Sequence, residues 1–173
     1  FPFPVVAHAT FELVSNRQHL IESEINRFLC GELASVMADA AEKSIDPSRP
    51  WRGLSIVTPT SAIDKVLAAM NFSEKLKGSC SNKRIIPVRG SKFTDAKHAK
   101  SIDGNFDELL KGDIFADLCL WTDDFDIERQ LQNLGVEPIT KTELKEHIDQ
   151  VTSTFSSETR AKLIYNLIDN DIV

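Results

Sequence analysis

The start of the chain holds an apolar run that is typical of a β-strand. Residues 5–14 are rich in β-branched and aromatic side chains, and Phe11 and Leu13 fall on one face of such a strand. Pro2 and Pro4 suit a strand entry or an edge strand, because proline cannot donate to a ladder. The chain opens inside this run and without an initiator methionine, so we expect it to be an excerpt of a longer polypeptide.

The strongest helical periodicity follows directly after this run. Ser15 with Gln18 three residues later fits a capping box, and Asn16 is an alternative cap. The helix should end near Lys43, before an Asp-Pro pair that disfavours its continuation. Its expected apolar face consists of Ile21, Ile25, Phe28, Leu29, Leu33, Val36, Met37 and Ala40.

A second, shorter helix is predicted after a loop at 46–52. Residues 54–57 form either a short strand or an extended lead into this helix. Ser61 and Asp64 have the spacing of a capping pair at its start. Its expected apolar side chains are Ile63, Val66, Leu67 and Met70.

A β-hairpin is predicted in the centre of the chain. The segments 84–88 and 91–94 flank Arg89 and Gly90, and the glycine can supply the backbone conformation of a tight turn. The hairpin is therefore the expected β element of the second half.

The last third is predicted to be helical. A helix at 126–134 should end at Gly135, because glycine favours the left-handed conformation of a helix C-terminus. Thr140 and Glu143 have the spacing of a capping box that opens the next helix. A final helix should begin near Ser156.

Together these elements predict an α+β fold. An N-terminal strand and a long helix would be followed by a second helix, the hairpin, short helices around the apolar clusters of 106–120, and a mostly helical C-terminal part. The glycine- and serine-rich stretch 78–82 is the expected boundary between subdomains. It would separate a strand–helix–helix subdomain at 1–78 from a hairpin plus helical subdomain at 79–173.

Composition and charge narrow the class of protein. The 173 residues are 42% hydrophobic and 27% charged, which is typical of a soluble chain of one or two domains. A net charge of −6 argues against a broad nucleic-acid-binding face. No apolar run approaches a membrane span, and signal-peptide features are missing from the opening residues. Three cysteines without local pairing fit buried thiols in a reducing compartment, so we expect a cytoplasmic location.

No motif in the chain names a reaction. Asp123, Asp124 and Asp126 cluster without the glycine and terminal glutamate of a calcium loop, so helix capping is the favoured interpretation. The histidines lack metal-ligand spacing, and His8 is expected to be buried on the first strand. No nucleophile–base pair is visible, and we expect no enzymatic activity from this chain. A small hydrolase would need a pocket that joins His8 or His19 to an acidic residue.

Two groups of residues are candidates for binding an anion. Asn16 and Arg17 lie where the strand would give way to the helix, and exposed backbone N–H groups there favour an anion. Around the hairpin, the candidate anion contacts are Arg84, Arg89 and Lys92. The alternative is an ordinary surface role, with nearby acids offsetting the hairpin's charge. The whole basic stretch comprises Lys83, Arg84, Arg89, Lys92, Lys97, His98 and Lys100.

The opening residues form the string F-P-F-P-x-x-x-H-A-T-F-E-L-x-S-N-R-x-x-L at 1–20, followed by Asn26 and Leu29. This string resembles a segment of sacsin-like proteins and their bacterial relatives. In these large proteins a similar stretch follows an ATPase domain of the GHKL class. Residues 84–102 look like the family's hairpin, and 131–148 resemble a later helix and its successor.

The resemblance implies that the chain lies downstream of a nucleotide-binding domain in a chaperone-like parent. ATP and Mg²⁺ would bind in that upstream domain and no cofactor in this segment, because the family's nucleotide motifs have no match here. Its partners would be the upstream ATPase domain and a protein client, without nucleic acid or membrane. Asn16 and Arg17 would sense nucleotide, by analogy with a basic transducer residue in related ATPases. The hairpin departs from the family pattern at Phe93, where tryptophan is usual, and at Arg89, where an acid is usual.

The leading prediction is therefore a non-catalytic middle segment of a large GHKL-type, sacsin-like ATPase, with a transducer-like or client-binding role. The alternative is an independent protein- or nucleic-acid-interaction module without an ATPase parent. The residues upstream of Phe1 separate the two hypotheses. A GHKL signature there favours the first, and a start codon or an unrelated domain favours the second.

Overall fold

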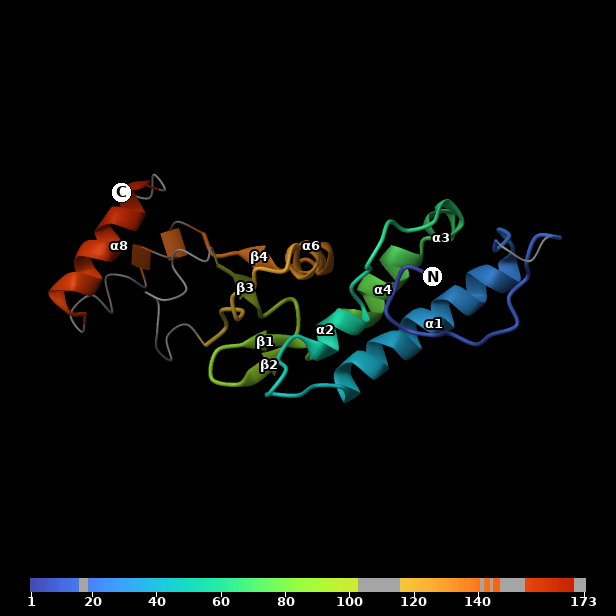
Figure 1. Ribbon diagram of the computed structural model, residues 1–173, viewed down its shortest axis with the longest axis horizontal. Coiled ribbons are helices and arrows are strands. Elements are labelled where there is room, and N and C mark those ends of the chain that lie inside the picture. Colours follow the sequence, from blue (N-terminus) through green and yellow to red (C-terminus); the bar gives the residue numbers. More distant parts are fainter. Residues whose placement is uncertain (16–18, 103–115, 141, 144, 147–154, 170–173) are drawn as a thin grey trace.

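The chain has an α+β fold that is elongated in Figure 1, with α8 at one end and α1 at the other. The computed structural model describes residues 1–15, 19–102, 116–140, 142–143, 145–146 and 155–169. Its helices are α1 Glu24–Lys43, α2 Arg52–Ile56, α3 Lys65–Ala69, α4 Phe72–Cys80, α6 Phe125–Leu134 and α8 Ser157–Asp169. Its strands are β1 Ile86–Val88, β2 Lys92–Thr94, β3 Lys100–Ser101 and β4 Glu137–Pro138. The predicted fold class is confirmed.

The long helix α1 ends where the sequence predicts but begins later. Its N-cap is Ser23, whose Oγ accepts a hydrogen bond from the backbone N–H of Asn26 at 3.1 Å. The predicted start at Ser15 is therefore wrong, and Asn16, the alternative cap, lies outside the described residues. The last helical residue is Lys43, as predicted.

The face of α1 that enters the core is lined mostly by small side chains; of the predicted apolar residues, Met37 is buried and Leu33 is partly buried against the core. Ile25, Phe28 and Val36 are 54%, 66% and 62% exposed. The neighbouring helix α2 comes so close that a Cβ added to Gly53 would lie 2.8 Å from the carbonyl oxygen of Ala41. At this contact the two backbones leave no room for a large side chain, and the buried face of α1 carries mostly small residues. The buried side chains of α1 are Asn26, Cys30, Ala34, Met37, Ala38 and Ala41.

The first residues form an extended arm rather than the predicted strand. This segment, residues 1–15 and 19–21, is called the N-terminal arm below, and it runs alongside α1 (Figure 1). A strand needs a neighbouring edge to bond to, whereas the sheets of the described chain lie elsewhere. An isolated antiparallel bridge joins Leu13 to Leu20. His8, predicted to be buried, is exposed.

The start of the arm is anchored on α4 and on the segment before α3. Phe3 is 5% exposed and meets the ring of Phe72 edge-on, with the ring centroids 5.5 Å apart. The backbone N–H of Thr60 donates to the carbonyl of Pro2 at 2.8 Å. These contacts close a loop of about sixty residues, so the arm belongs to the tertiary fold and not to local structure.

The central part of the chain is helical even at residues for which the sequence allowed a strand. Residues 54–57, predicted as a strand or an extended lead, lie in α2 and at its C-terminus. The predicted capping pair is wrong, because the N-cap of α3 is Asp64 itself, whose Oδ1 accepts from the N–H of Val66 at 2.8 Å, and Ser61 lies before the helix. The expected boundary at 78–82 overlaps α4, and one buried cluster contains residues from both sides of it. Whether 1–78 and 79–173 fold separately stays a prediction.

The predicted hairpin is confirmed. Strands β1 and β2 pair antiparallel, with Ile86 opposite Thr94. Gly90 and Ser91 in the turn have φ values of 74° and 58°, a region that glycine adopts without strain. A second, parallel pair joins β3 to β4, with Lys100 opposite Glu137.

The segment after β3 does not follow the prediction of short helices where it is described. Leu118 and Cys119 form isolated bridges to Lys100 and Val88, so this stretch is extended. Residues 103–115, which hold most of the predicted apolar clusters, lie outside the described residues.

The helix termini of the last third are confirmed. Asp124 caps α6, and Gly135 ends it with φ at 89°. The capping box is reciprocal: the N–H of Thr140 donates to Glu143 Oε2 at 2.8 Å, and the N–H of Glu143 donates to Thr140 Oγ1 at 3.2 Å. Ser156 Oγ accepts from the first turn of α8.

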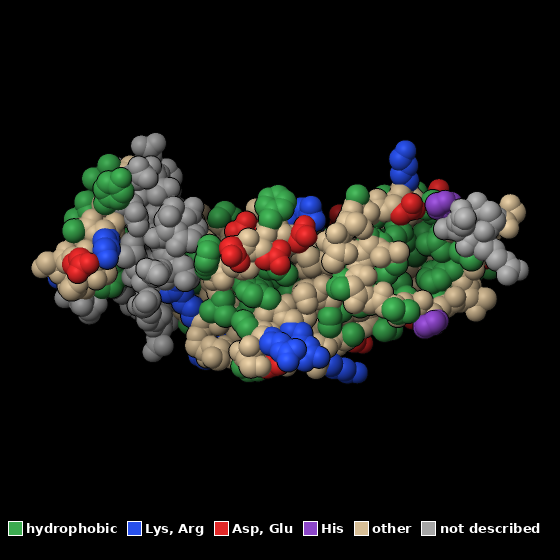
Figure 2. All heavy atoms as spheres, viewed as in Figure 1, with side chains coloured by type: hydrophobic (Ala, Val, Ile, Leu, Met, Phe, Trp, Pro, Cys, Tyr) green, Lys and Arg blue, Asp and Glu red, His purple; other side chains and the backbone are tan. Residues whose placement is uncertain are grey.

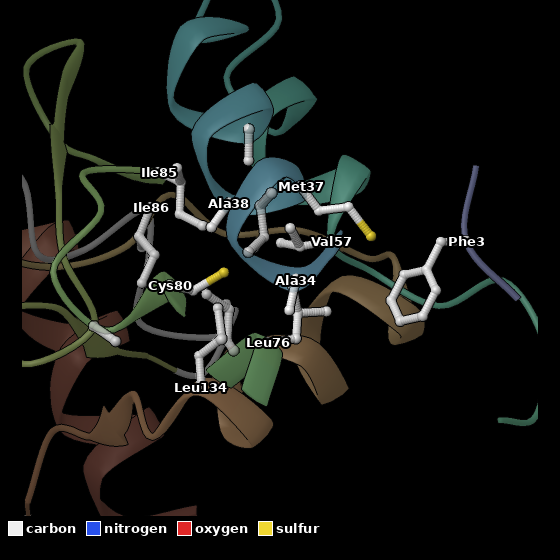
Figure 3. Packing of buried hydrophobic residues seen from close by; sticks show 14 of the residues in the cluster. Phe3, Ala34, Met37, Ala38, Val57, Leu76, Cys80, Ile85, Ile86 and Leu134 are labelled. Carbon is white, nitrogen blue, oxygen red and sulfur yellow. The ribbon is translucent and has the colours of Figure 1, made fainter. Parts of the chain in front are cut away.

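One buried cluster connects the arm, α1, α2, α4, the hairpin and α6 (Figure 3). It includes Cys30, Cys80 and Cys119, which are free thiols. Burial raises the pKa of Cys80 and Cys119 to about 12, so these thiols remain protonated at neutral pH. The prediction of buried thiols is confirmed.

Candidate functional site

The described segments on either side of residues 16–18 are held together by a buried carboxamide. Asn26 is fully buried in the first turn of α1. Its Oδ1 accepts from the backbone N–H of Glu12 at 2.8 Å, and its Nδ2 donates to the carbonyls of Glu12 and Ile21 at 2.7 and 2.9 Å. One side chain of α1 therefore holds both segments.

Backbone hydrogen bonds complete this base. The N–H of Val14 donates to the carbonyl of His19 at 3.0 Å, and the N–H of Ile21 donates to that of Glu12 at 3.2 Å. The candidate sensors Asn16 and Arg17 belong to the connection between these two segments but lie outside the described residues. Their predicted role is therefore untested.

A pocket of about 430 Å³ opens between the N-terminal arm, α1 and the residues around α3. This volume lies in the range of small-molecule sites. Most of its wall is apolar, and the polar side chains that reach it include His19, Ser61 and Asp64. The pocket thus joins a histidine to an acid, the condition that a hydrolase would have to meet.

The polar side chains of the pocket do not form a catalytic group in the described part of the chain. Asp64 uses Oδ1 to cap α3. No hydrogen bond between described residues joins His19 to Asp64 or to Ser61, so an oriented nucleophile–base pair is missing there. Burial raises the pKa of Cys30, which makes its thiol a poor nucleophile.

The three anion-contact candidates lie around the hairpin. Arg84 is exposed before β1, and its backbone N–H donates to Glu42 Oε1 at 3.2 Å. Arg89 is half-buried in the turn, and its backbone N–H donates to the carbonyl of Leu118 at 3.2 Å. Lys92 is exposed at the start of β2. Nothing in these contacts assigns an anion to the three side chains.

Neighbouring cations of the basic stretch pair with acids. Lys83 contacts Asp39 at 2.7 Å and Glu42 at 3.0 Å. Its hydrogen bonds hold the pKa of both carboxyl groups below their usual values. Lys100 lies 3.3 Å from Glu137. These pairs favour the interpretation of a surface whose charge is offset by nearby acids.

The acidic cluster before α6 is used for capping. Asp124 Oδ1 accepts from the N–H of Asp126 at 2.9 Å, and Asp126 pairs with Arg129 at 2.7 Å. Among the residues that the structure describes, no group of three or more histidine, cysteine or acidic side chains has the geometry of a metal site. The capping interpretation is confirmed.

No family model, curated protein or solved structure matched this chain. The resemblance to sacsin-like proteins therefore rests on the sequence strings alone. No helix within the described ranges is long and apolar enough to cross a membrane.

Sequence reasoning missed both the pocket and the role of Asn26. A signal for the second was present, because Asn26 precedes Cys30 by four residues and so shares a helix face with it. A carboxamide on a core-facing position needs hydrogen-bond partners, and here the arm supplies them. The pocket has no local signal, since its walls come from three separate segments.

Proposed function

We propose that this chain is a non-catalytic, transducer-like segment of a large, cytoplasmic, sacsin-like ATPase of the GHKL class. The observation that carries the proposal is that Asn26 of α1 bonds Glu12 and Ile21, which lie on either side of Asn16 and Arg17 in the sequence. Three positions of the resemblance string, Phe3, Leu20 and Asn26, are also positions where the arm is held. A family that used Asn16 and Arg17 as a sensor would need those anchors.

The attachment offers a physical route for a signal. ATP and Mg²⁺ would bind in an upstream domain, and Arg17 would contact the terminal phosphate. A shift of Asn16 and Arg17 would act on Asn26, because that side chain bonds the segments on either side of them. α1 would carry the shift along its length to α2 and α4, which pack on its buried face. A protein client is the proposed recipient of this movement.

The test uses a longer polypeptide that includes the residues encoded upstream of Phe1. Arg17→Ala should lower its ATP turnover about tenfold, as expected for loss of a charge-assisted contact of about 1.4 kcal/mol. Arg27→Ala is the matched control, because Arg27 is an exposed arginine of α1 paired with Glu22 at 2.6 Å. The 173-residue chain alone should neither bind nor hydrolyse ATP. Hydrolysis by the chain alone, or equal turnover in the two variants, would contradict the proposal.

An independent protein-interaction module is the second candidate. The exposed side chains of Ile25, Phe28 and Val36 on α1 favour it, because large apolar groups on an outer helix face often mark a contact surface. An unrelated domain upstream of Phe1, combined with loss of partner binding in Phe28→Glu, would support this candidate over the first.

A further inference from the structure

We propose that the pocket beneath the N-terminal arm binds an amphiphilic amine, meaning a cationic amine attached to an apolar group. The proposal is independent of the ATPase hypothesis, since it rests on the pocket's shape and chemistry alone. Hydrophobic side chains gather at the surface around α1 and the arm, at the end of the molecule opposite α8 (Figures 1 and 2).

The apolar walls of the pocket favour a ligand that carries an apolar group. Large apolar side chains from the arm, α1 and α3 surround the hollow, and several retain exposed surface that a ligand would cover. Removing such surface from water favours binding of an apolar group. The main apolar lining residues are Phe1, Phe11, Leu13, Leu20, Leu33 and Leu67.

The charge of the ligand is set by Asp64. Asp64 is one of the lining residues, and the described lining residues include no lysine or arginine. Oδ1 is held by the N–H of Val66, which fixes the orientation of the group. The other carboxylate oxygen accepts no hydrogen bond from the residues that the structure describes, and it can accept one from an amine. An anion would meet this carboxylate, and the described lining residues include no lysine or arginine side chain to offset it.

The pocket is formed before a ligand arrives, because the arm is fixed on both sides of it. The Phe3–Phe72 contact and the Thr60–Pro2 hydrogen bond hold the start of the arm. Asn26 holds its other end. Preformed walls lower the entropy that binding must overcome.

A series of probes with the same apolar group tests the charge preference. We would titrate the isotope-labelled chain with 4-phenylbutylamine, 4-phenylbutanol and 4-phenylbutyrate at pH 8 and low salt, and follow backbone amide shifts. The amine should saturate shifts at Leu13, Ala62 and Leu67 with an affinity about three- to fivefold above the alcohol, the range of an exposed ion pair. The carboxylate should bind most weakly. High salt should reduce the difference between amine and alcohol.

Two variants and a control complete the test. Asp64→Asn can keep the cap but removes the charge, so the amine should fall to the affinity of the alcohol. Asp124→Asn makes the same change at the N-cap of α6, and its amine affinity should stay that of the wild type. Ala62→Trp, at an exposed lining residue, should weaken all three probes by filling the pocket. The proposal fails if the wild type binds no amine, if Asp64→Asn leaves the amine preference intact, or if the shifts lie away from the pocket.

Discussion

Replacing Asn26 by alanine should release the N-terminal arm from α1. The carboxamide makes three hydrogen bonds to the arm's backbone, at 2.7 to 2.9 Å, and is fully buried. A net contribution of about 0.5–1.5 kcal/mol for each bond gives a loss of about 3 kcal/mol. The Glu12 N–H and the Ile21 carbonyl lose their partner, and they can regain one by taking up water, which requires the arm to lift. Because domains of this size are stable by about 5–15 kcal/mol, the variant should still fold.

Two measurements separate loss of the arm from general destabilisation. Urea denaturation reports the unfolding free energy, and hydrogen exchange followed by mass spectrometry reports protection of the arm and of α4 separately. Exchange of the arm should accelerate about 100-fold, with a smaller effect in α4. Asn26→Asp should be no better than alanine, because a carboxylate oxygen would face the two carbonyls that Nδ2 now serves.

Asn82→Ala is the matched control. Asn82 is an exposed carboxamide whose Oδ1 accepts from Lys97 Nζ at 3.3 Å, so its loss should change stability by less than about 0.5 kcal/mol. The reasoning is refuted if Asn26→Ala behaves like Asn82→Ala and the exchange of the arm is unchanged.

Further predictions concern packing, thiols and pH. Gly53→Ala should lower the free energy of unfolding by about 1–3 kcal/mol in urea denaturation, because the new methyl group would meet the backbone of α1. Gly78→Ala in α4 meets nothing within 4 Å and should raise the free energy of unfolding by about 0.5–1 kcal/mol. Equal effects of the two substitutions would show that the α1–α2 contact is looser than described. Cys80 and Cys119, with a pKa raised to about 12, should react with dithiobis(nitrobenzoate) at pH 8 only after unfolding, and rapid reaction of the folded chain would argue against their burial. Lys83 lowers the pKa of two carboxyl groups on α1, so its contribution to stability is present above their ordinary pKa values of 3.8 and 4.5 and is lost as the pH falls through the lowered values. Lys83→Met should therefore flatten the acid side of the stability profile, and an unchanged slope there would rule this linkage out.

The parts of the fold that the sequence predicted correctly are specified by local chemistry. Asp124 and Gly135 mark the two ends of α6 because a cap and a left-handed glycine act within one turn. The turn of the hairpin and the capping box at Thr140 follow the same logic. Each of these features depends on residues only a few positions apart, so one sequence is enough to predict it.

The features that the sequence did not predict depend on contacts between distant segments. The periodicity of α1 fits more than one face, and the buried one is the face that packs on α2 and α4, where Gly53 of α2 comes close to Ala41. The apolar run of the arm has the composition of a strand but pairs with no sheet of the described residues, and Phe3 before it docks on Phe72. The pocket forms between the docked arm, α1 and the residues around α3, so it depends on these distant contacts. The capping pattern of Asp64 does not indicate that this residue also lines the pocket.

The anchors of the arm also determine when the arm can dock during translation. A ribosome releases Pro2 and Phe3 long before Thr60 and Phe72, so the nascent chain must carry its opening aromatic residues uncovered until α4 has emerged. Protease added to ribosome-bound chains stalled at increasing lengths should therefore cut the arm until α4 is outside the exit tunnel, and early protection would contradict this order. During that interval the apolar side chains of the arm are exposed and can bind chaperones.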